Sequence, residues 1–287
     1  MIAIMLRELR TYFLTPIGYV FMGLFLLVSA FFFTGGNLVG GSSYYANFLA
    51  SILFLYIFST PLLTMRLLSE ERKQRTDQLL LTSPITVLEI VLGKFLAAFI
   101  VFLCTLVVTV LYALVIYFYG DLAVWETVGA YIGFLLLGGS FIAIGIVISG
   151  VSENQVSAAF FTFFTLLLVW FVDLIRNVSP VTVLSGVIFA AAIGIALALF
   201  FYFNTKNWIV TGIVAAIAGA TVGVVYAIDS SLYENLIVNV LAWISLLGRF
   251  DSFALGLIKL SDVVFYLSFI SILLFITTRL IEKRRWA

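Results

Sequence analysis

FLAAFIVFLCTLVVTVLYALVIYFY, which occupies residues 95–119, contains no aspartate, glutamate, lysine or arginine. An α-helix rises about 1.5 Å per residue, so about 20 apolar residues cross the roughly 30 Å hydrocarbon layer of a bilayer. The run is long enough for one membrane-spanning helix. It belongs to a longer segment, 88–119, which is apolar apart from Glu89 and Lys94.

Apolar runs of similar length recur through the chain. The 287 residues are 64% hydrophobic and 10% charged, which is more apolar than a soluble domain can bury. None of the runs alternates apolar and polar residues as the strands of a membrane β-barrel do. The sequence therefore predicts an all-α, polytopic membrane helix bundle, a single transmembrane domain over 1–287 with about eight spans. The other predicted spans are 17–35, 48–66, 127–149, 156–173, 181–202, 207–228 and 262–281.

Positive charges predict the orientation of the bundle, because lysine and arginine accumulate in cytoplasmic segments. With the N-terminus in the cytoplasm, only Arg176, Arg249 and Lys259 of the 15 lysines and arginines fall on the outer side. An even number of spans returns the C-terminus to the cytoplasm. We therefore expect both termini and residues 67–94 to be cytoplasmic.

Composition weighs against several classes of function. The chain has no histidine and one cysteine, Cys104, so it lacks the commonest catalytic base and any disulfide. We expect no catalytic residue, bound cofactor or metal site, and the net charge of +1 gives no reason to expect nucleic acid. Acidic residues such as Asp121 and Glu126 fall near span ends, which disfavours a proton relay. An intramembrane enzyme is the weakest hypothesis, and a secondary transporter or channel remains an alternative.

Two further segments, 1–15 and 229–261, contain apolar residues but are not predicted to span the membrane. Residues 1–15, MIAIMLRELRTYFLT, carry Met5, Leu9 and Phe13 at helical spacing and predict an amphipathic helix in the headgroup region. In 229–261, the apolar run LIVNVLAWISLLG ends at Gly248 and is too short to span a bilayer. We expect 229–261 to form half-helices that dip in from the outer side.

A dense polar stretch, SEERKQRTDQLLLTSP, runs from Ser69 to Pro84 between two apolar spans. Ser69 predicts a helix N-cap, and the charges of Glu71 and Arg75 lie four residues apart on one helix face. The stretch predicts a short cytoplasmic helix, fixed at both ends, that docks a soluble partner. Periodicity alone favours a solvated charged loop, and this alternative stays open.

The segment EERKQRTDQLLLTSPIT, residues 70–86, resembles the coupling region of the permeases of type-2 ABC exporters. RELRTYFLTPIGYV (7–20) is similar to their amphipathic entry helix and first span, and SENQVSAAF (152–160) to their second cytoplasmic turn. The stretch 249–286 resembles their outer half-helices and last span. The branch with the greatest likeness includes the gliding-motility and nitrous-oxide-system permeases. Residues 174–228 depart from the family's six-helix core and look like an inserted helix pair.

The resemblance implies the permease subunit of an exporter in a bacterial inner (cytoplasmic) membrane. Such a permease pairs with a second copy or a paralogous permease, with an accessory protein on the outer side as a further partner. A separate ABC ATPase subunit would hold ATP-Mg and drive it. The resemblance implies that the following residues contact that ATPase: Glu70, Glu71, Arg72, Arg75, Thr76, Leu79, Leu80, Ser83, Pro84, Glu153, Asn154 and Gln155.

A phosphate-binding loop of its own is not expected in this chain. Such a loop reads G-x-x-x-x-G-K-[ST]. The only Gly-Lys pair is Gly93-Lys94, which Phe95 follows. ATP hydrolysis is therefore expected on a separate polypeptide.

Overall fold

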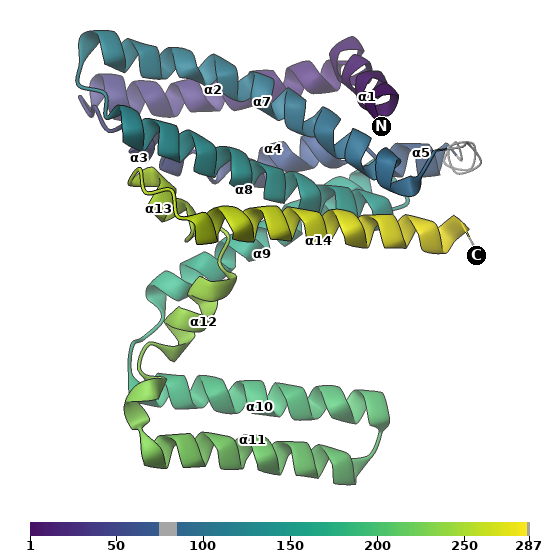
Figure 1. The fold of residues 1–287 in the computed structure, drawn as a ribbon, viewed down its shortest axis with the longest axis vertical. Coiled ribbons are helices and arrows are strands. Elements are labelled where there is room, and N and C mark those ends of the chain that lie inside the picture. Colours follow the sequence, from purple (N-terminus) through teal and green to yellow (C-terminus); the bar gives the residue numbers. More distant parts are fainter. Residues whose placement is uncertain (75–84, 286–287) are drawn as a thin grey trace. The chain divides into compact units, whose positions relative to one another are not determined.

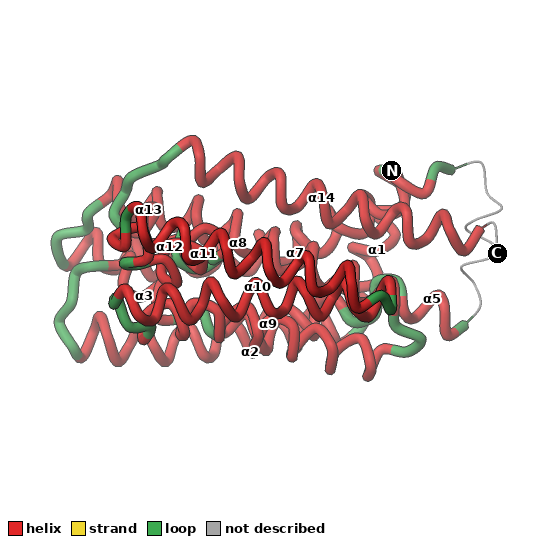
Figure 2. The backbone as a smooth tube through the Cα atoms, turned by 90° about the horizontal axis from the view of Figure 1, so that it is seen from below, coloured by secondary structure: helices red, strands yellow, loops and turns green. Residues whose placement is uncertain are grey.

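A computed structural model describes residues 1–74 and 85–285, and in this part of the chain every regular element is a helix (Figure 2). Seven helices are long and apolar enough to cross a membrane, and a bent helix pair makes an eighth candidate. The predicted polytopic helix bundle of about eight spans is confirmed. The seven long candidates are α2 (Pro16–Phe33) with its π-helical extension η1 (Thr34–Val39), α7 (Val87–Tyr119), α8 (Val124–Val151), α9 (Gln155–Val178), α10 (Val183–Thr205), α11 (Trp208–Ile228) and α14 (Leu260–Arg285).

The chain divides into two compact units. One consists of Met1–Trp170 and Arg249–Ala287, and the other is Phe171–Gly248. The shorter helices of the larger unit are α1 (Ile2–Leu14), α3 (Tyr45–Ser51), α4 (Leu55–Thr64), α5 (Ser69–Lys73) and α13 (Phe250–Ala254), and those of the smaller unit are η2 (Ser230–Tyr233) and α12 (Leu236–Ile244).

Helix α8 is the centre of the larger unit. Its spanning window is 72% buried, against 28% for α2 and 22% for α14, and it packs on α4, α7, α13 and α14. Glycines allow this close approach. A Cβ atom at Gly138 would lie 2.4 Å from the Phe102 ring, and one at Gly145 would lie 2.2 Å from the Thr64 hydroxyl oxygen. Because real Cβ atoms do not come so near, the α4 and α7 contacts with α8 depend on glycine.

The eighth candidate span is bent by 63° between α3 and α4. Tyrosine hydroxyls tie both halves to their neighbours. Tyr45 on α3 donates to the Thr109 carbonyl at 2.8 Å and lies 2.8 Å from the Tyr131 hydroxyl, and Tyr56 on α4 donates to the Phe134 carbonyl at 2.6 Å. These bonds give buried hydroxyls partners where water is scarce.

The N-terminus, α5 and the C-terminal end of α14 lie at the same end of the larger unit (Figures 1 and 2). The N-terminal ammonium group lies 3.6 Å from a carboxylate oxygen of Glu89, in the first turn of α7. This placement agrees with an even number of crossings. That this end faces the cytoplasm remains the prediction from charge.

The smaller unit contains a hairpin of α10 and α11, which lie side by side (Figure 1). Lys206 turns the chain with a positive φ of 50°, and the Asn207 side chain caps α11 by accepting from the Ile209 N–H at 2.9 Å. No residue of α11 is buried within the described structure. The segment predicted to be inserted, 174–228, falls inside this unit.

Residues 229–261 contain η2, α12 and α13, and each is shorter than a membrane span. Helix α12 ends at Ser245, whose hydroxyl donates to Asp173 at 2.9 Å and accepts from the Gly248 N–H at 2.8 Å. Near α13, Arg249 pairs with Asp262 at 2.8 Å. The depth of these helices in a bilayer stays a prediction.

Candidate functional site

Helix α5 is the described beginning of the polar stretch, and α8 holds its first turn. The Ser149 hydroxyl of α8 accepts hydrogen bonds from the backbone N–H groups of Leu68 at 3.1 Å and Ser69 at 3.2 Å. The predicted N-cap at Ser69 is wrong, because Leu68 occupies that position and the Ser69 hydroxyl donates to the Met65 carbonyl. A side chain from another helix therefore satisfies N–H groups that a helix start leaves unpaired.

Four charged side chains meet beside α5 and form what we call the ion cluster: Arg7, Glu8, Glu71 and Lys94. The Lys94 ammonium nitrogen lies 3.1 Å from a carboxylate oxygen of Glu8 and 3.0 Å from one of Glu71. The Arg7 guanidinium lies 2.7 Å and 2.6 Å from the same two oxygens. Two cations and two anions thus join α1, α5 and α7.

Lys94 is the most deeply placed member of the ion cluster. Its side chain is 1% exposed, those of Glu8 and Glu71 are 13% and 16% exposed, and Arg7 is 51% exposed. Lys94 also donates to the Leu67 carbonyl at 2.5 Å. A buried charge is strongly unfavourable unless it is paired and hydrogen-bonded, and both conditions are met here. The cluster therefore fixes where α1 and α5 lie on α7.

The electrostatics of Glu8 agree with this arrangement. Burial of its carboxyl group favours the neutral form and acts to raise the pKa. The charge of Lys94 and the hydrogen bonds from Arg7 and Lys94 outweigh burial, so the pKa of Glu8 is lowered below its ordinary value of 4.5. Glu8 is therefore ionised at neutral pH and supplies one of the two negative charges.

A second set of contacts joins α5 to the turn between α8 and α9. Arg72 donates to the Val151 carbonyl at 2.5 Å and lies 3.3 Å from a carboxylate oxygen of Glu153. Glu153 is 82% exposed. Asn154 directly precedes α9, and its side chain accepts a hydrogen bond at 2.8 Å from the backbone N–H of Ser157, the third residue of that helix. Arg72 and Asn154 therefore fix the backbone on either side of Glu153, and the Glu153 side chain is exposed to solvent.

An open groove of about 500 Å³ lies beside this turn. Its walls are mostly apolar, and Glu153 is the charged residue among those that line it. Such a groove next to an exposed carboxylate suits an amphipathic segment of a partner that carries a basic side chain. The lining residues are Val147, Ile148, Val151, Ser152, Glu153, Asn154, Ser157 and Phe161.

Comparison with protein families identifies a related family. The model of the ABC-2 family transporter proteins matches residues 14–180, which is more than half of the chain. The chain belongs to the ABC-2 transporter family. It is therefore a multi-pass membrane component of an ABC transporter, and the resemblance seen in the sequence is confirmed at that level. A search of curated proteins found no match.

In this ABC-2 transporter protein, the structure brings together only part of the set expected to contact an ATPase. Arg72 meets Glu153, but Glu71 turns inward to Arg7 and Lys94. Glu70 accepts from Gln74 at 2.5 Å, while Gln155 begins α9 and Asn154 directly precedes it. The remaining expected residues lie outside the described residues: Arg75, Thr76, Leu79, Leu80, Ser83 and Pro84.

Sequence reasoning missed the partners of Glu71. Lys94 is the one basic residue in the long apolar run of α7, and such a residue needs a counter-charge. Glu8 lies midway between Ile4 and Tyr12, the two buried residues of α1, at spacings of four. These two signals predict that Lys94 and Glu8 are buried charges, but they do not predict that the two residues pair.

The charged side chains of the candidate site pair mainly with one another. No group of three or more cysteine and acidic side chains in it could hold a metal ion. The Lys94 ammonium is fully engaged by Glu8, Glu71 and the Leu67 carbonyl. The site is built from intrachain charge contacts and one exposed carboxylate, which suits mechanical contact with a partner.

Proposed function

We propose that this chain is the permease subunit of an ATP-driven exporter. A separate ABC ATPase, which holds ATP-Mg, docks on 69–84 and on the α8–α9 turn. The observation that carries the proposal is the position of α5, which ion pairs join to α1 and α7 and hydrogen bonds join to α8. If a docked partner moves α5, these contacts would carry the movement to α1, α7 and α8 together.

The contacts divide into two kinds with different tasks. Glu153 is exposed and can meet a basic group of the ATPase, whereas Glu71 and Lys94 face each other inside the protein. When the ATPase closes on ATP, its movement would reach α5 and the α8–α9 turn. The ion cluster would then carry α1 and α7 along, and the spans would tilt as rigid bodies between inward-open and outward-open states.

Several finer assignments rest on the resemblance and the family. The permease works as a pair, with a second copy or a paralogous permease, in a bacterial inner membrane. An accessory protein on the outer side is a further partner. The branch is that of the gliding-motility and nitrous-oxide-system permeases, and 174–228 is a helix pair added to a six-helix core. The alternative is a secondary transporter or channel that needs no ATPase.

A charge reversal at Glu153 tests the ATPase partner. Glu153→Arg should greatly reduce co-purification of the proposed ABC ATPase partner, because removing one partner of a charge pair in an interface costs about 2–5 kcal/mol. Stability of the permease should stay near normal, since an ion pair as exposed as Arg72–Glu153 contributes only about 0–1 kcal/mol.

The matched control is Glu234→Arg, which changes an exposed carboxylate on the predicted outer side. This control should leave ATPase binding unchanged. Full ATPase retention by a well-folded Glu153→Arg variant would contradict the docking role of the turn. Transport by the purified chain in vesicles without any ATPase would instead favour the secondary transporter or channel.

A further inference from the structure

Helix α1 has an inward face and an exposed face, and Arg7 is the member of the ion cluster that reaches the exposed face. Ile4, Glu8 and Tyr12 point into the protein at spacings of four residues, and the Tyr12 hydroxyl donates to the Leu63 carbonyl. On the remaining surface, Leu6 is 52% exposed and Leu14 is 83% exposed. Large apolar side chains so exposed on a short helix need a covering surface.

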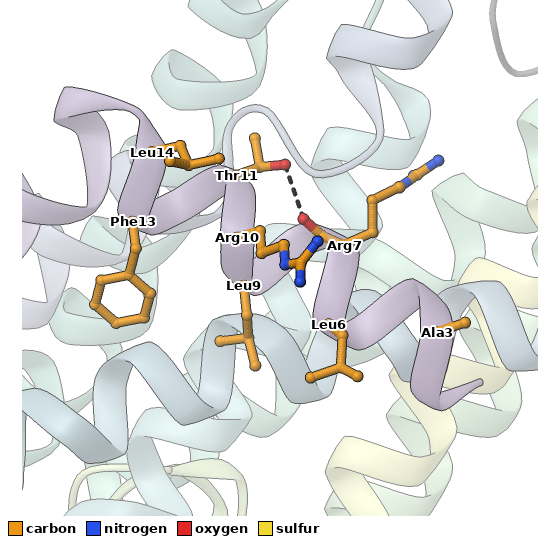
Figure 3. A pocket seen from close by; sticks show the side chains of 8 residues that line it. All are labelled: Ala3, Leu6, Arg7, Leu9, Arg10, Thr11, Phe13 and Leu14. Atoms are coloured by element: carbon orange, nitrogen blue, oxygen red, sulfur yellow. Dashed lines mark hydrogen bonds between the residues drawn. The ribbon is translucent and has the colours of Figure 1, made fainter.

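That surface forms an open groove of about 880 Å³, lined by α1 alone (Figure 3). Leu6, Leu9 and Phe13 project along one side of the helix, and the Arg10 side chain extends along it toward Arg7 (Figure 3). Arg10 is exposed, and no carboxylate pairs with it among the described residues. An apolar wall beside a cation that no carboxylate of the described residues neutralises has the chemistry of a site for an amphiphilic anion.

An aromatic contact links the groove to a candidate membrane span. The Phe13 ring meets the edge of the Tyr19 ring at a centroid distance of 6.3 Å, and Tyr19 lies in the first turn of α2. Tyr19 is 60% exposed on a helix that is long and apolar enough to cross a membrane. A molecule in the groove can therefore have its acyl chains in the bilayer beside α2 while its headgroup is level with α1.

We propose that the groove of α1 binds an anionic phospholipid of the leaflet on the α5 side. Arg10 pairs with the headgroup phosphate, and Leu6, Leu9 and Phe13 contact the upper part of the acyl chains. Arg7 lines the same groove and also pairs with Glu71, so a bound headgroup lies next to the ion cluster. This inference concerns the permease alone and does not depend on an ATPase or on the transported substrate.

A photoactivatable phosphatidylglycerol tests the site. The purified chain is placed in nanodiscs of phosphatidylcholine with this probe, and crosslinked peptides are mapped by mass spectrometry. We expect labelling of residues 1–15 and a loss of about fivefold in Arg10→Gln, because one basic residue near an anionic surface contributes about 1 kcal/mol. Arg10→Lys should keep most of the labelling, since it keeps the charge.

The control variant is Lys206→Gln, which removes an exposed cation from the α10–α11 turn and should leave labelling of α1 unchanged. Equal labelling in the wild type and a folded Arg10→Gln variant would overturn the proposal. So would equal labelling by a photoactivatable phosphatidylcholine. Displacement of the lipid by soluble glycerol phosphate would also overturn it, because the site would then be one for a free phosphate.

Discussion

Lys94→Met is the sharpest test of the ion cluster. Methionine keeps the length and apolar stem of lysine and removes the ammonium group that lies 3.1 Å from Glu8 and 3.0 Å from Glu71. Two carboxylates then face each other with Arg7 as their only remaining cation among the described residues. Removing one partner of a buried ion pair costs about 3–5 kcal/mol, because the other charge stays buried without compensation.

The structure places the expected loss at the lower end of this range. Arg7 still reaches both carboxylates at 2.7 and 2.6 Å, but it is 51% exposed and so shares its charge with water. We therefore expect a loss of about 3 kcal/mol. In a chain of this size, about 1 kcal/mol corresponds to about 2–4 °C in melting temperature. The assay is the melting temperature of the chain in detergent, with ATPase co-purification measured in parallel.

Two further variants separate charge from packing. Lys94→Met combined with Glu71→Gln leaves Arg7 and Glu8 as a neutral pair and should recover much of the stability, because the two positions are coupled. Lys259→Met removes an exposed lysine and should have little effect. If Lys94→Met melts like the wild type, or if the double variant is less stable than the single one, the ion cluster does not hold α1, α5 and α7 together.

The other predictions concern charge, pH, packing and topology. Glu71→Arg should lower both stability and ATPase retention, because the new cation faces Arg7 and Lys94 inside the protein; unchanged melting would contradict this. Since the pKa of Glu8 is lowered, its stabilising effect should be complete above about pH 4.5 and fade as the pH falls through the lowered pKa, so the wild type and Glu8→Gln should converge in acid melting experiments. Gly138→Ala should cost about 1–3 kcal/mol of stability, because its Cβ atom would enter the Phe102 ring; a neutral effect would mean that α7 and α8 can separate. Single cysteines at Gln74 and Ser231 in a Cys104→Ala background should react from opposite sides of the membrane, and labelling of both from one side would refute the predicted orientation.

The spans could be read from the sequence because their signal is local. A helix in lipid satisfies its own backbone, so length and apolarity are enough to predict residues such as 95–119 as a span. The 63° bend between α3 and α4 has no comparable signal. Pro61 lies within α4 rather than at the bend, and the hydrogen bond that secures α3 runs from Tyr45 to Thr109, far along the chain.

The candidate site could be predicted only in outline. The pattern of charges drew attention to the polar stretch, and the family resemblance drew attention to the α8–α9 turn, but neither could tell which carboxylates face outward. Glu71 is 16% exposed and Glu153 is 82% exposed, although both are glutamates in short polar segments. The difference comes from Lys94 and Arg7, which lie near Glu71 only after three separate helices have packed. The cap that Ser149 provides for α5 is equally non-local.

Under the proposed function, the two glutamates would divide docking and transmission between them. A carboxylate that must bind a partner and also hold the fold would lose one role whenever it performed the other. Here the exposed Glu153 is available for binding, and its contact with Arg72 is weak enough to be exchanged for a partner's cation. Glu71 lies on the same side of the protein but is bound to Lys94 in its interior, where water does not compete. If the ATPase docks as proposed, a force applied at the α8–α9 turn would reach α5 through Arg72, which also donates to the Val151 carbonyl. It would reach α1 and α7 through contacts that docking itself does not need to break.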